Sequence, residues 1–314
     1  MRKRSLDMVY ELAKKDERIV FIGSDLGVGT LDNFRKEMPD RFFMEGVSEA
    51  NIVGMAAGMA LEGRIVYVNT IATFLTRRCF EQVVLDLGLH NANVRLIANG
   101  GGVVYAPLGP THLAIDDLAI MRAVPNMTIV APSDAEEMSR LMPQTVDHPG
   151  PIYIRLGKGG DPVVSDPGKP FRIGKAIQMT SGSDVLLVTT GITLKIGLEA
   201  AEALKHRGVD ATVLHMHTVK PLDVDAILLH AAKAHAIVTI EEHTIMGGLG
   251  GAVAEVLAEA GFNPAKRFRR IGLPDVFPHG YGSQASMMEH YGITTDKTIT
   301  TVNDLLLRTH GTTA

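Results

Sequence analysis

One acidic residue, Glu49, begins a predicted helix that is otherwise built from small and apolar side chains, in the run VSEANIVGMAAGMALEG at 47–63. Several of these residues share one helical face: Ala50, Gly54, Ala57, Gly58 and Leu61. Small side chains let two backbones approach closely, so we expect Glu49 to enter a buried contact. Burial favours the protonated form of a carboxyl, which suits a group that exchanges a proton with a ligand. Alternatively, Glu49 is an ordinary first-turn acid in a helix that Ser48 caps.

Further polar side chains follow the predicted strands, at the sheet edge where doubly wound folds bind ligands. They come from the segments SDLG (24–27), TFLTR (73–77), GPTH (109–112) and IRLGKG (154–159). These segments combine an acid, an aromatic face, an imidazole and basic groups, a set that suits an anionic and partly aromatic ligand. His112 follows Gly-Pro-Thr, where a rigid turn can hold an imidazole toward a pocket for hydrogen bonding or proton transfer. The plainer alternative is a polar rim with no catalytic role.

Composition narrows the class of protein. The 314 residues are 46% hydrophobic and 21% charged, and the apolar runs are interrupted too often for a membrane span of about 18 residues. The single cysteine, Cys79, excludes an internal disulfide, and no Cys/His spacing resembles a zinc site. The net charge of −4 argues against broad nucleic-acid binding. With a basic amino terminus that passes directly into a charged helix, these features predict a cytoplasmic protein with a small-molecule partner.

Strand-like apolar runs alternate with helical patterns along the chain, which favours an α/β fold with a parallel sheet covered by helices. The expected strands are 19–24, 65–70, 94–99, 127–131, 152–156, 185–189, 212–216, 237–240 and 268–271. The expected helices are 3–15, 49–62, 74–90, 134–146, 193–207, 223–233 and 248–260. Glycines and prolines at 157–170 exclude both a helix and a strand in that segment. We therefore divide the chain into two domains, 1–165 and 172–314. The second domain is also α/β and is the smaller one.

Two glycine-rich segments invite a nucleotide-binding interpretation and match it poorly. In GGLGGAVAEVLAEAG (247–261), Val253 stands where a dinucleotide motif needs its third glycine or alanine. The glycines at 100–102 lack the lysine of a phosphate-binding loop and predict a tight turn near a ligand. Of the 12 histidines, His215 and His217 alternate on a predicted strand, as core or solvated histidines do.

In their order along the chain, these motifs resemble the carboxyl-terminal half of the thiamine diphosphate-dependent transketolases and 1-deoxyxylulose-5-phosphate synthases. The motifs that carry the resemblance are SDLG, EGVSEANIVGMAAGMALEG, TFLTR, GPTH, RAVPNMTIVAPSDAEE, IRLGKG, VKPLD and EEHTIMGGLGG. GPTH together with PSDAEE is fairly specific, and the tail LPDVFPHG (273–280) is similar to the synthase branch. The resemblance implies a thiamine diphosphate-binding pyrimidine domain followed by a transketolase carboxyl-terminal domain.

The resemblance also implies how the chain would hold the cofactor. Glu49 would hydrogen-bond N1′ of the aminopyrimidine and favour its imino tautomer, whose 4′-imine removes the C2 proton of the thiazolium. Phe74, Arg77 and Phe80 would line the aminopyrimidine site, with Phe74 as its hydrophobic contact. Asp25 would lie near the thiazolium, where a negative charge helps to hold the cation.

For the substrate, the resemblance implies that His112 contacts oxygens of the substrate and intermediate. Arg155, assisted by Lys158, would bind a substrate phosphate. Two departures point to a less usual sugar. Leu108 stands where transketolases have a substrate-contacting aspartate, and Gly100 falls where they have a phosphate-contacting histidine.

One family motif is missing from the chain. The tripeptide Gly-Asp-Gly, followed about thirty residues later by Asn in the family, holds the diphosphate and Mg²⁺, and it does not occur here. We therefore expect a split enzyme, in which an amino-terminal partner subunit holds most of the Mg²⁺ site, with two copies of each chain in a heterotetramer. Three alternatives stay open: a 1-deoxyxylulose-5-phosphate synthase-like enzyme, the beta subunit of a 2-oxoacid dehydrogenase, and a non-catalytic structural partner.

Overall fold

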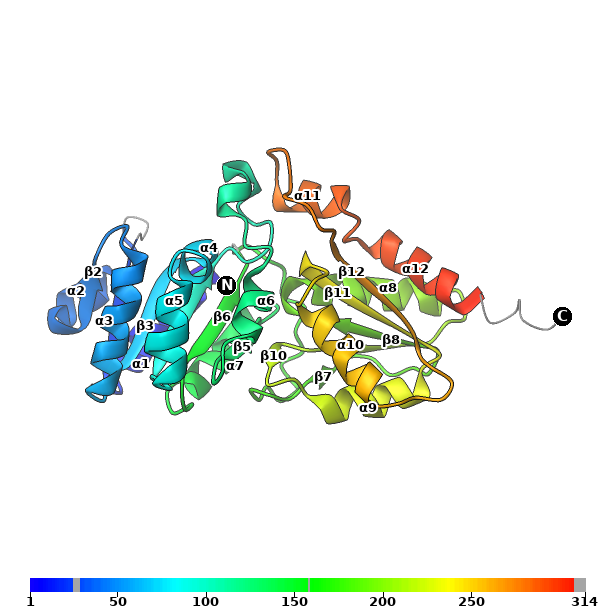
Figure 1. The fold of residues 1–314 in the computed structure, drawn as a ribbon, viewed down its shortest axis with the longest axis horizontal. Helices are drawn as coiled ribbons and strands as arrows, with labels where there is room; N and C mark the ends of the chain where they lie inside the picture. The colour runs from blue at the N-terminus through cyan, green and yellow to red at the C-terminus, as the bar shows by residue number, and fades with distance from the viewer. Residues whose placement is uncertain (25–28, 158, 308–314) are drawn as a thin grey trace.

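The computed structural model describes residues 1–24, 29–157 and 159–307, which form two α/β halves lying side by side (Figure 1). The first half contains a seven-stranded sheet of order β10-β5-β6-β4-β3-β1-β2, and the second a five-stranded sheet of order β12-β11-β8-β9-β7. Neighbouring strands are parallel except at two edges, where β10 runs antiparallel to β5 and β7 to β9. The predicted α/β fold class is confirmed.

The strands of the first sheet are β1 (Ile19–Gly23), β2 (Phe42–Met44), β3 (Ile65–Ile71), β4 (Val94–Asn99), β5 (Thr128–Val130), β6 (Ile152–Leu156) and β10 (Thr218–Lys220). Those of the second are β7 (Ile177–Gln178), β8 (Val185–Thr189), β9 (Ala211–His215), β11 (Ala236–Thr244) and β12 (Arg267–Leu273).

The α-helices are α1 (Arg2–Ala13), α2 (Asp32–Glu37), α3 (Glu49–Leu61), α4 (Ala72–Thr76), α5 (Phe80–Gln82), α6 (Asp117–Arg122), α7 (Ala135–Leu141), α8 (Leu194–Lys205), α9 (Val224–Lys233), α10 (Leu249–Glu259), α11 (Gln284–His290) and α12 (Thr295–Leu307). A π-helix, η2 (Val83–Leu89), continues α5. The 3₁₀ turns are η1 (Pro39–Arg41), η3 (Ala106–Leu108), η4 (Pro110–His112), η5 (Met142–Thr145) and η6 (Gly191–Thr193). In the part of the chain that the structure describes, no helix is long and apolar enough to cross a membrane.

Helices cover both faces of each sheet because successive strand residues point to opposite sides. In β1, Val20 and Ile22 belong to the same apolar cluster as Ile52 of α3, whereas Phe21 belongs to the cluster that contains Leu6 of α1. The second sheet repeats the arrangement, with α8 and α12 on one face and α9 and α10 on the other. Two apolar layers therefore enclose each sheet and leave its strand ends at the surface.

The predicted strands and helices are present within a few residues of their expected bounds, with one exception. The helix expected at 74–90 is broken into α4, α5 and η2, with a turn at 77–79. The break occurs because Cys79 leaves helical backbone angles, at φ −125° and ψ 31°. The sequence patterns did not predict β2, β7, β10, α2, α6, α11 or α12.

Strand β10 comes from the carboxyl-terminal half of the chain yet completes the amino-terminal sheet. Thr218 pairs with Val130 of β5. Nζ of Lys220 donates to the carbonyl oxygens of Arg122 and Val124, at 3.0 and 2.5 Å. The predicted domain boundary at 165–172 therefore does not separate the two sheets completely, because β10 follows the boundary and belongs to the first sheet.

A buried polar cluster joins the two halves. Asp117, the first residue of α6, accepts hydrogen bonds from Tyr153 Oη at 2.8 Å and from Arg155 Nε at 2.7 Å. Across the interface, Nη2 of Arg155 donates to the carbonyl oxygen of Glu242 on β11 at 2.8 Å. Asp117 is 0% and Arg155 6% exposed, so their charges neutralise each other away from water.

Replacing Asp117 with Asn should leave the Arg155 charge buried without its partner, at a cost of about 3–5 kcal/mol in unfolding free energy. Urea denaturation followed by circular dichroism measures this cost. The matched control is Asp7→Asn, which removes an exposed ion pair with Lys3 and should cost less than about 1 kcal/mol. Equal losses in the two variants would contradict a structural role for the buried pair.

Candidate active site

Glu49 is the first residue of α3 and is only 2% exposed, although its side chain is acidic. Its Oε2 atom lies 2.9 Å from Nη1 of Arg78, which forms an ion pair with it. Ser48 does not cap the helix with its side chain, because its Oγ donates to the carbonyl oxygen of Glu45 at 2.9 Å. Ser48 is thus the N-cap residue by position, as predicted, but its side chain does not cap the helix. The carboxylate of Glu49 lies at a buried helix start instead of on a solvated face.

Phe74 lies on α4, directly after the end of β3, and links three other side chains. Its ring centroid is 5.3 Å from that of the His112 imidazole, in an edge contact with 65° between the planes. The guanidinium carbon of Arg78 lies over the Phe74 ring, 3.9 Å from its centroid. Glu49, Arg78, Phe74 and His112 therefore form one continuous series of contacts, although they come from three separate segments.

A constrained turn holds His112. Gly109 has φ 77° and ψ −176°, a conformation essentially restricted to glycine. Pro110 then starts η4, and the Thr111 hydroxyl hydrogen-bonds Nδ1 of His112 at 2.9 Å. Nη2 of Arg77 donates to the carbonyl oxygen of Thr111 at 3.4 Å, which ties this turn to the end of α4. The rigid turn predicted around His112 is present.

Phe74, Arg78 and the Pro110–Thr111 turn border an open cavity of about 680 Å³, whereas Glu49 and His112 are not among its lining residues. Its lining residues are Thr73, Phe74, Arg77, Arg78, Pro110, Thr111, Phe277 and His279. In Figure 1 the loop between β12 and α11 reaches toward the η3 and η4 turns at the top of the molecule. We refer to this cavity as the Phe74 cleft.

Six lining residues of the Phe74 cleft were not among the predicted site residues. Thr73, Pro110 and Thr111 lie within the motifs TFLTR and GPTH, whereas Arg78, Phe277 and His279 lie outside both motifs. Phe277 is 70% exposed, which is unusual for so large an apolar side chain. Phe277 and His279 belong to LPDVFPHG, a segment to which the sequence patterns gave no role beyond its similarity to the synthase branch. Its aromatic and imidazole side chains in a proline-rich loop were the available signal.

Comparison with known proteins decides the family. Residues 1–160 match the transketolase pyrimidine binding domain, and residues 174–298 match the transketolase C-terminal domain. The chain belongs to the transketolase family. The expected resemblance is confirmed over both halves of the sequence.

Relatives within the transketolase family include short chains and long ones. The chain is 36% identical over 309 residues to the 6-deoxy-6-sulfo-D-fructose transketolase subunit SqwH of Clostridium sp., covering 98% of this chain and 95% of that one. It is 38% identical to an apulose-4-phosphate transketolase subunit of Phocaeicola vulgatus, covering 93% of each. It is also 38% identical to 1-deoxy-D-xylulose-5-phosphate synthase 1 of Geobacter sulfurreducens, covering 91% of this chain and 45% of that enzyme.

A solved structure described as a split gene transketolase, inactive beta4 tetramer, has the same fold. It superposes with a TM-score of 0.89 at 35% sequence identity, covering 98% of both chains. This transketolase-family chain thus has the length of the family's separately encoded subunits.

The other predicted site residues of this transketolase-family chain do not meet in the Phe74 cleft. Phe80 packs against the apolar cluster that includes α3. Arg155 is buried between the halves and donates to Asp117, Ala114 and Glu242. The structure therefore does not present its guanidinium to a substrate phosphate. Asp25 and Lys158 lie outside the described residues.

The glycines at 100–102 pack against large side chains and do not border the Phe74 cleft. A Cβ atom at Gly101 would lie 2.6 Å from Cγ of Arg155, and one at Gly102 would meet the carboxyl carbon of Glu242. At Gly102 φ is also +69°, so the backbone itself favours glycine. Gly101 and Gly102 therefore make room for the polar groups at the interface between the halves, and the expectation that this turn lies near a ligand stays a prediction.

The second glycine segment also has a structural partner. Both oxygens of Glu241 accept hydrogen bonds at the start of α10, from the backbone N–H of Leu249 at 2.7 Å and of Gly250 at 2.8 Å. A dinucleotide pyrophosphate would need these same donors. His215 and His217 are fully buried, and Nε2 of His215 lies 2.9 Å from Glu137.

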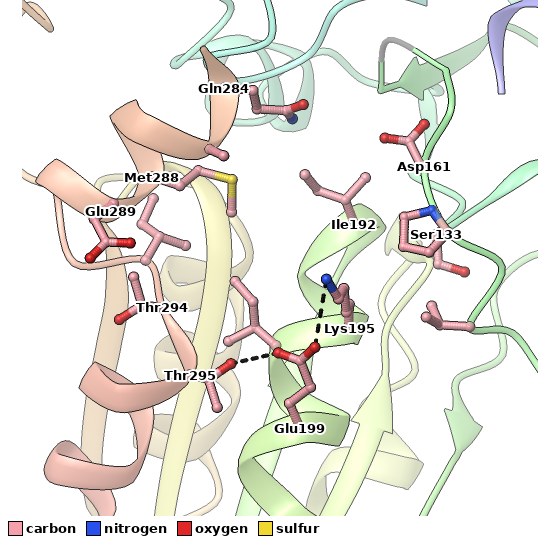
Figure 2. Close-up of a pocket in the computed structure, with 15 residues that line it drawn as sticks. Ser133, Asp161, Ile192, Lys195, Glu199, Gln284, Met288, Glu289, Thr294 and Thr295 are labelled. Carbon is pink, nitrogen blue, oxygen red and sulfur yellow. Dashed lines mark hydrogen bonds and ion pairs between the residues drawn. The ribbon is translucent and has the colours of Figure 1, made fainter. Parts of the chain in front are cut away.

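A separate cavity of about 380 Å³ lies between α8 and α11, and Ser133 and Asp161 also line it (Figure 2). Two of its charged groups pair with each other: Lys195 lies 3.6 Å from Glu199, which also accepts a 2.8 Å hydrogen bond from Thr295. None of the predicted site residues lines this cavity. This cavity is therefore not the place where the described cofactor-binding and substrate-binding residues predicted from the sequence lie.

The residues around Glu49 fit a planar nitrogen heterocycle. A buried carboxylate oxygen and an aromatic face both contact the guanidinium of Arg78, which is flat and carries N–H groups. An aminopyrimidine likewise has a flat face and a ring nitrogen, so the pyrimidine of thiamine suits these residues. Among the described residues, no group of three or more His, Cys, Asp or Glu side chains could hold a metal ion.

The pKa of Glu242 makes the interface between the halves sensitive to pH. Burial raises the pKa of this carboxyl from 4.5 to about 7, while Arg155 and the hydrogen bonds from Val103 and Gln284 oppose the rise. The folded chain thus holds the proton more tightly than the unfolded chain does. This stabilisation is present at low pH and is lost as the pH rises through about 7.

We expect Glu242→Gln to remove this dependence. Relative to the variant, the wild-type chain should lose unfolding free energy between pH 5 and pH 8, because each unit of pKa difference corresponds to about 1.4 kcal/mol. Urea titrations at both pH values measure the change. Glu289→Gln alters an exposed acid on α11 and should follow the wild type. Parallel pH profiles for the wild type and Glu242→Gln would refute the assignment.

Proposed function

We propose that this chain is the pyrimidine-binding subunit of a thiamine diphosphate-dependent transferase that moves a two-carbon ketol or acyl unit between carbonyl compounds, with sugars as the substrate class. The observation that carries the proposal is that buried Glu49 and the Phe74 ring both contact Arg78, while His112 makes an edge contact with the same ring. The transketolase family membership of both halves supports it.

Each of these side chains has a task in the proposed reaction. The Glu49 carboxyl would form a hydrogen bond with the pyrimidine ring nitrogen and exchange a proton with it. The burial of Glu49 keeps water from competing for that bond. Phe74 provides the flat apolar surface for the ring. Thiamine diphosphate supplies, when bound, a nucleophilic carbon for the donor carbonyl. His112, whose imidazole makes an edge contact with the Phe74 ring, holds or moves a proton at substrate oxygens.

The proposal includes a partner subunit. The Gly-Asp-Gly tripeptide is absent from the sequence, so we assign most of the Mg²⁺ and diphosphate contacts to a separate amino-terminal chain. Relatives of the same length are described as transketolase subunits. We propose a heterotetramer with two copies of each chain, acting in the cytoplasm.

The substrate contacts are proposed with one change from the sequence analysis. Asp25 and Lys158 keep their proposed roles near the thiazolium and the substrate. Arg155 is engaged by Asp117 in the buried pair, so we do not assign it a phosphate. A synthase-like acyl transfer is a second candidate because the chain is 38% identical to the synthase of Geobacter sulfurreducens.

Replacing Glu49 with Gln tests the proposal in the assembled complex. Turnover of a ketose phosphate donor with an aldose phosphate acceptor should fall by about a hundredfold or more, because proton exchange at the ring nitrogen is lost. The circular dichroism spectrum should stay unchanged, since Gln has nearly the same shape.

The matched control is Glu45→Gln, which changes an exposed acid just before α3 and should retain wild-type turnover. Wild-type turnover by Glu49→Gln would overturn the catalytic assignment. A wild-type complex that binds no thiamine diphosphate with Mg²⁺ in calorimetry would overturn the enzyme proposal as a whole.

A further inference from the structure

Arg78 makes two contacts that the proposed function reserves for the cofactor. Its Nη1 lies 2.9 Å from Oε2 of Glu49, and its guanidinium carbon lies 3.9 Å from the centroid of the Phe74 ring. The cofactor's aminopyrimidine would need this same carboxylate oxygen and this same aromatic face. A guanidinium is planar, delocalised and rich in N–H donors, so it can meet both requirements of a flat nitrogen ring.

We propose that Arg78 acts as a plug, which competes with the cofactor for the pyrimidine subsite and must move aside for the cofactor to enter. This inference rests on the proposed function, because it takes Glu49 and Phe74 as the residues that hold the pyrimidine. The plug is an internal competitor that lowers the apparent affinity of the chain for the cofactor.

The position of Arg78 lets it move without disturbing the core. It lies in the turn at 77–79 between α4 and α5, and its side chain is 46% exposed. It borders the open Phe74 cleft, so the side chain has space into which it can swing. Its neighbour Arg77 is instead fixed by the carbonyl oxygens of Thr111 and Leu113.

The ion pair with Glu49 explains why Arg78 stays at the subsite. Glu49 is 2% exposed, and a buried carboxylate without a partner is strongly unfavourable. Arg78 provides the compensating charge together with a cation–π contact to Phe74. A bound ring that hydrogen-bonds Glu49 replaces both contacts, which allows the arginine to leave.

Calorimetric titration of the assembled complex with thiamine diphosphate and Mg²⁺ tests the plug. Arg78→Ala removes the competitor, so the Kd should fall by roughly five- to tenfold, as when the binding-competent fraction of a protein rises. Arg78→Lys keeps the charge and loses the planar face, so its Kd should lie between that of the wild type and that of Arg78→Ala. Arg64→Ala, an exposed arginine that donates to the Glu17 carbonyl oxygen, is the control and should bind as the wild type does.

Unfolding of the isolated chain gives a second readout that needs no cofactor. Arg78→Ala and Glu49→Gln should each lower the urea midpoint, and the double variant should lose less than the sum of both, because they break one shared contact. If Arg78→Ala does not fold, Arg78→Lys replaces it in this cycle and in the titration. Strict additivity would overturn the contact on which the plug depends.

The outcomes separate the two proposals. The plug alone is overturned if the wild-type complex binds the cofactor and the Kd of Arg78→Ala is either within twofold of the wild-type Kd or higher than it. A wild-type complex that binds no cofactor overturns the proposed function, and the plug with it. Tighter binding by Arg78→Ala, with non-additive unfolding in the empty chain, supports both.

Discussion

The buried pair between Arg155 and Asp117 is the interaction on which the arrangement of the two halves depends. Removing two charges from water costs several kcal/mol for each ion, and only a complete set of partners offsets that cost. Here Tyr153 and the backbone of Ala114 and Glu242 complete the set. Side chains at Gly101 and Gly102 would collide with Arg155 and Glu242, which fill that space. Substrate chemistry at this arginine would require the pair to open.

The candidate active site lies outside this neutralised interface, at the ends of strands of the amino-terminal sheet. β3 leads directly into α4, which places Phe74 at the sheet edge, and α3 brings Glu49 to the same edge. The η4 turn brings His112 there from farther along the chain. Strand ends can carry such groups because the sheet and its covering helices are stable without them.

Glu49 illustrates how a buried carboxylate can be neutralised at the start of a helix. Burial excludes water from the carboxylate, and the half-exposed guanidinium of Arg78 neutralises it in the meantime. The turn at 77–79, which breaks the helix expected at 74–90, places Arg78 over the Phe74 ring. The tetramer described as inactive among the solved relatives is a comparable chain on which this geometry can be tested.

The layered α/β fold could be predicted from the sequence, because the alternation of apolar runs and amphipathic helices leaves few other ways to bury those side chains. Glu49, Phe74 and His112 could be chosen in the same way, since their residue types stand out within local motifs. The place of Arg155, the sheet to which β10 belongs and the partner of Glu49 emerged only from the tertiary contacts. The contacts of Glu49 and Arg155 join side chains to groups 29 to 87 positions away, and no local pattern records which distant charge will meet which. The chemistry open to a buried charge depends on the group that neutralises it, and the tertiary fold determines which group lies close enough to do so.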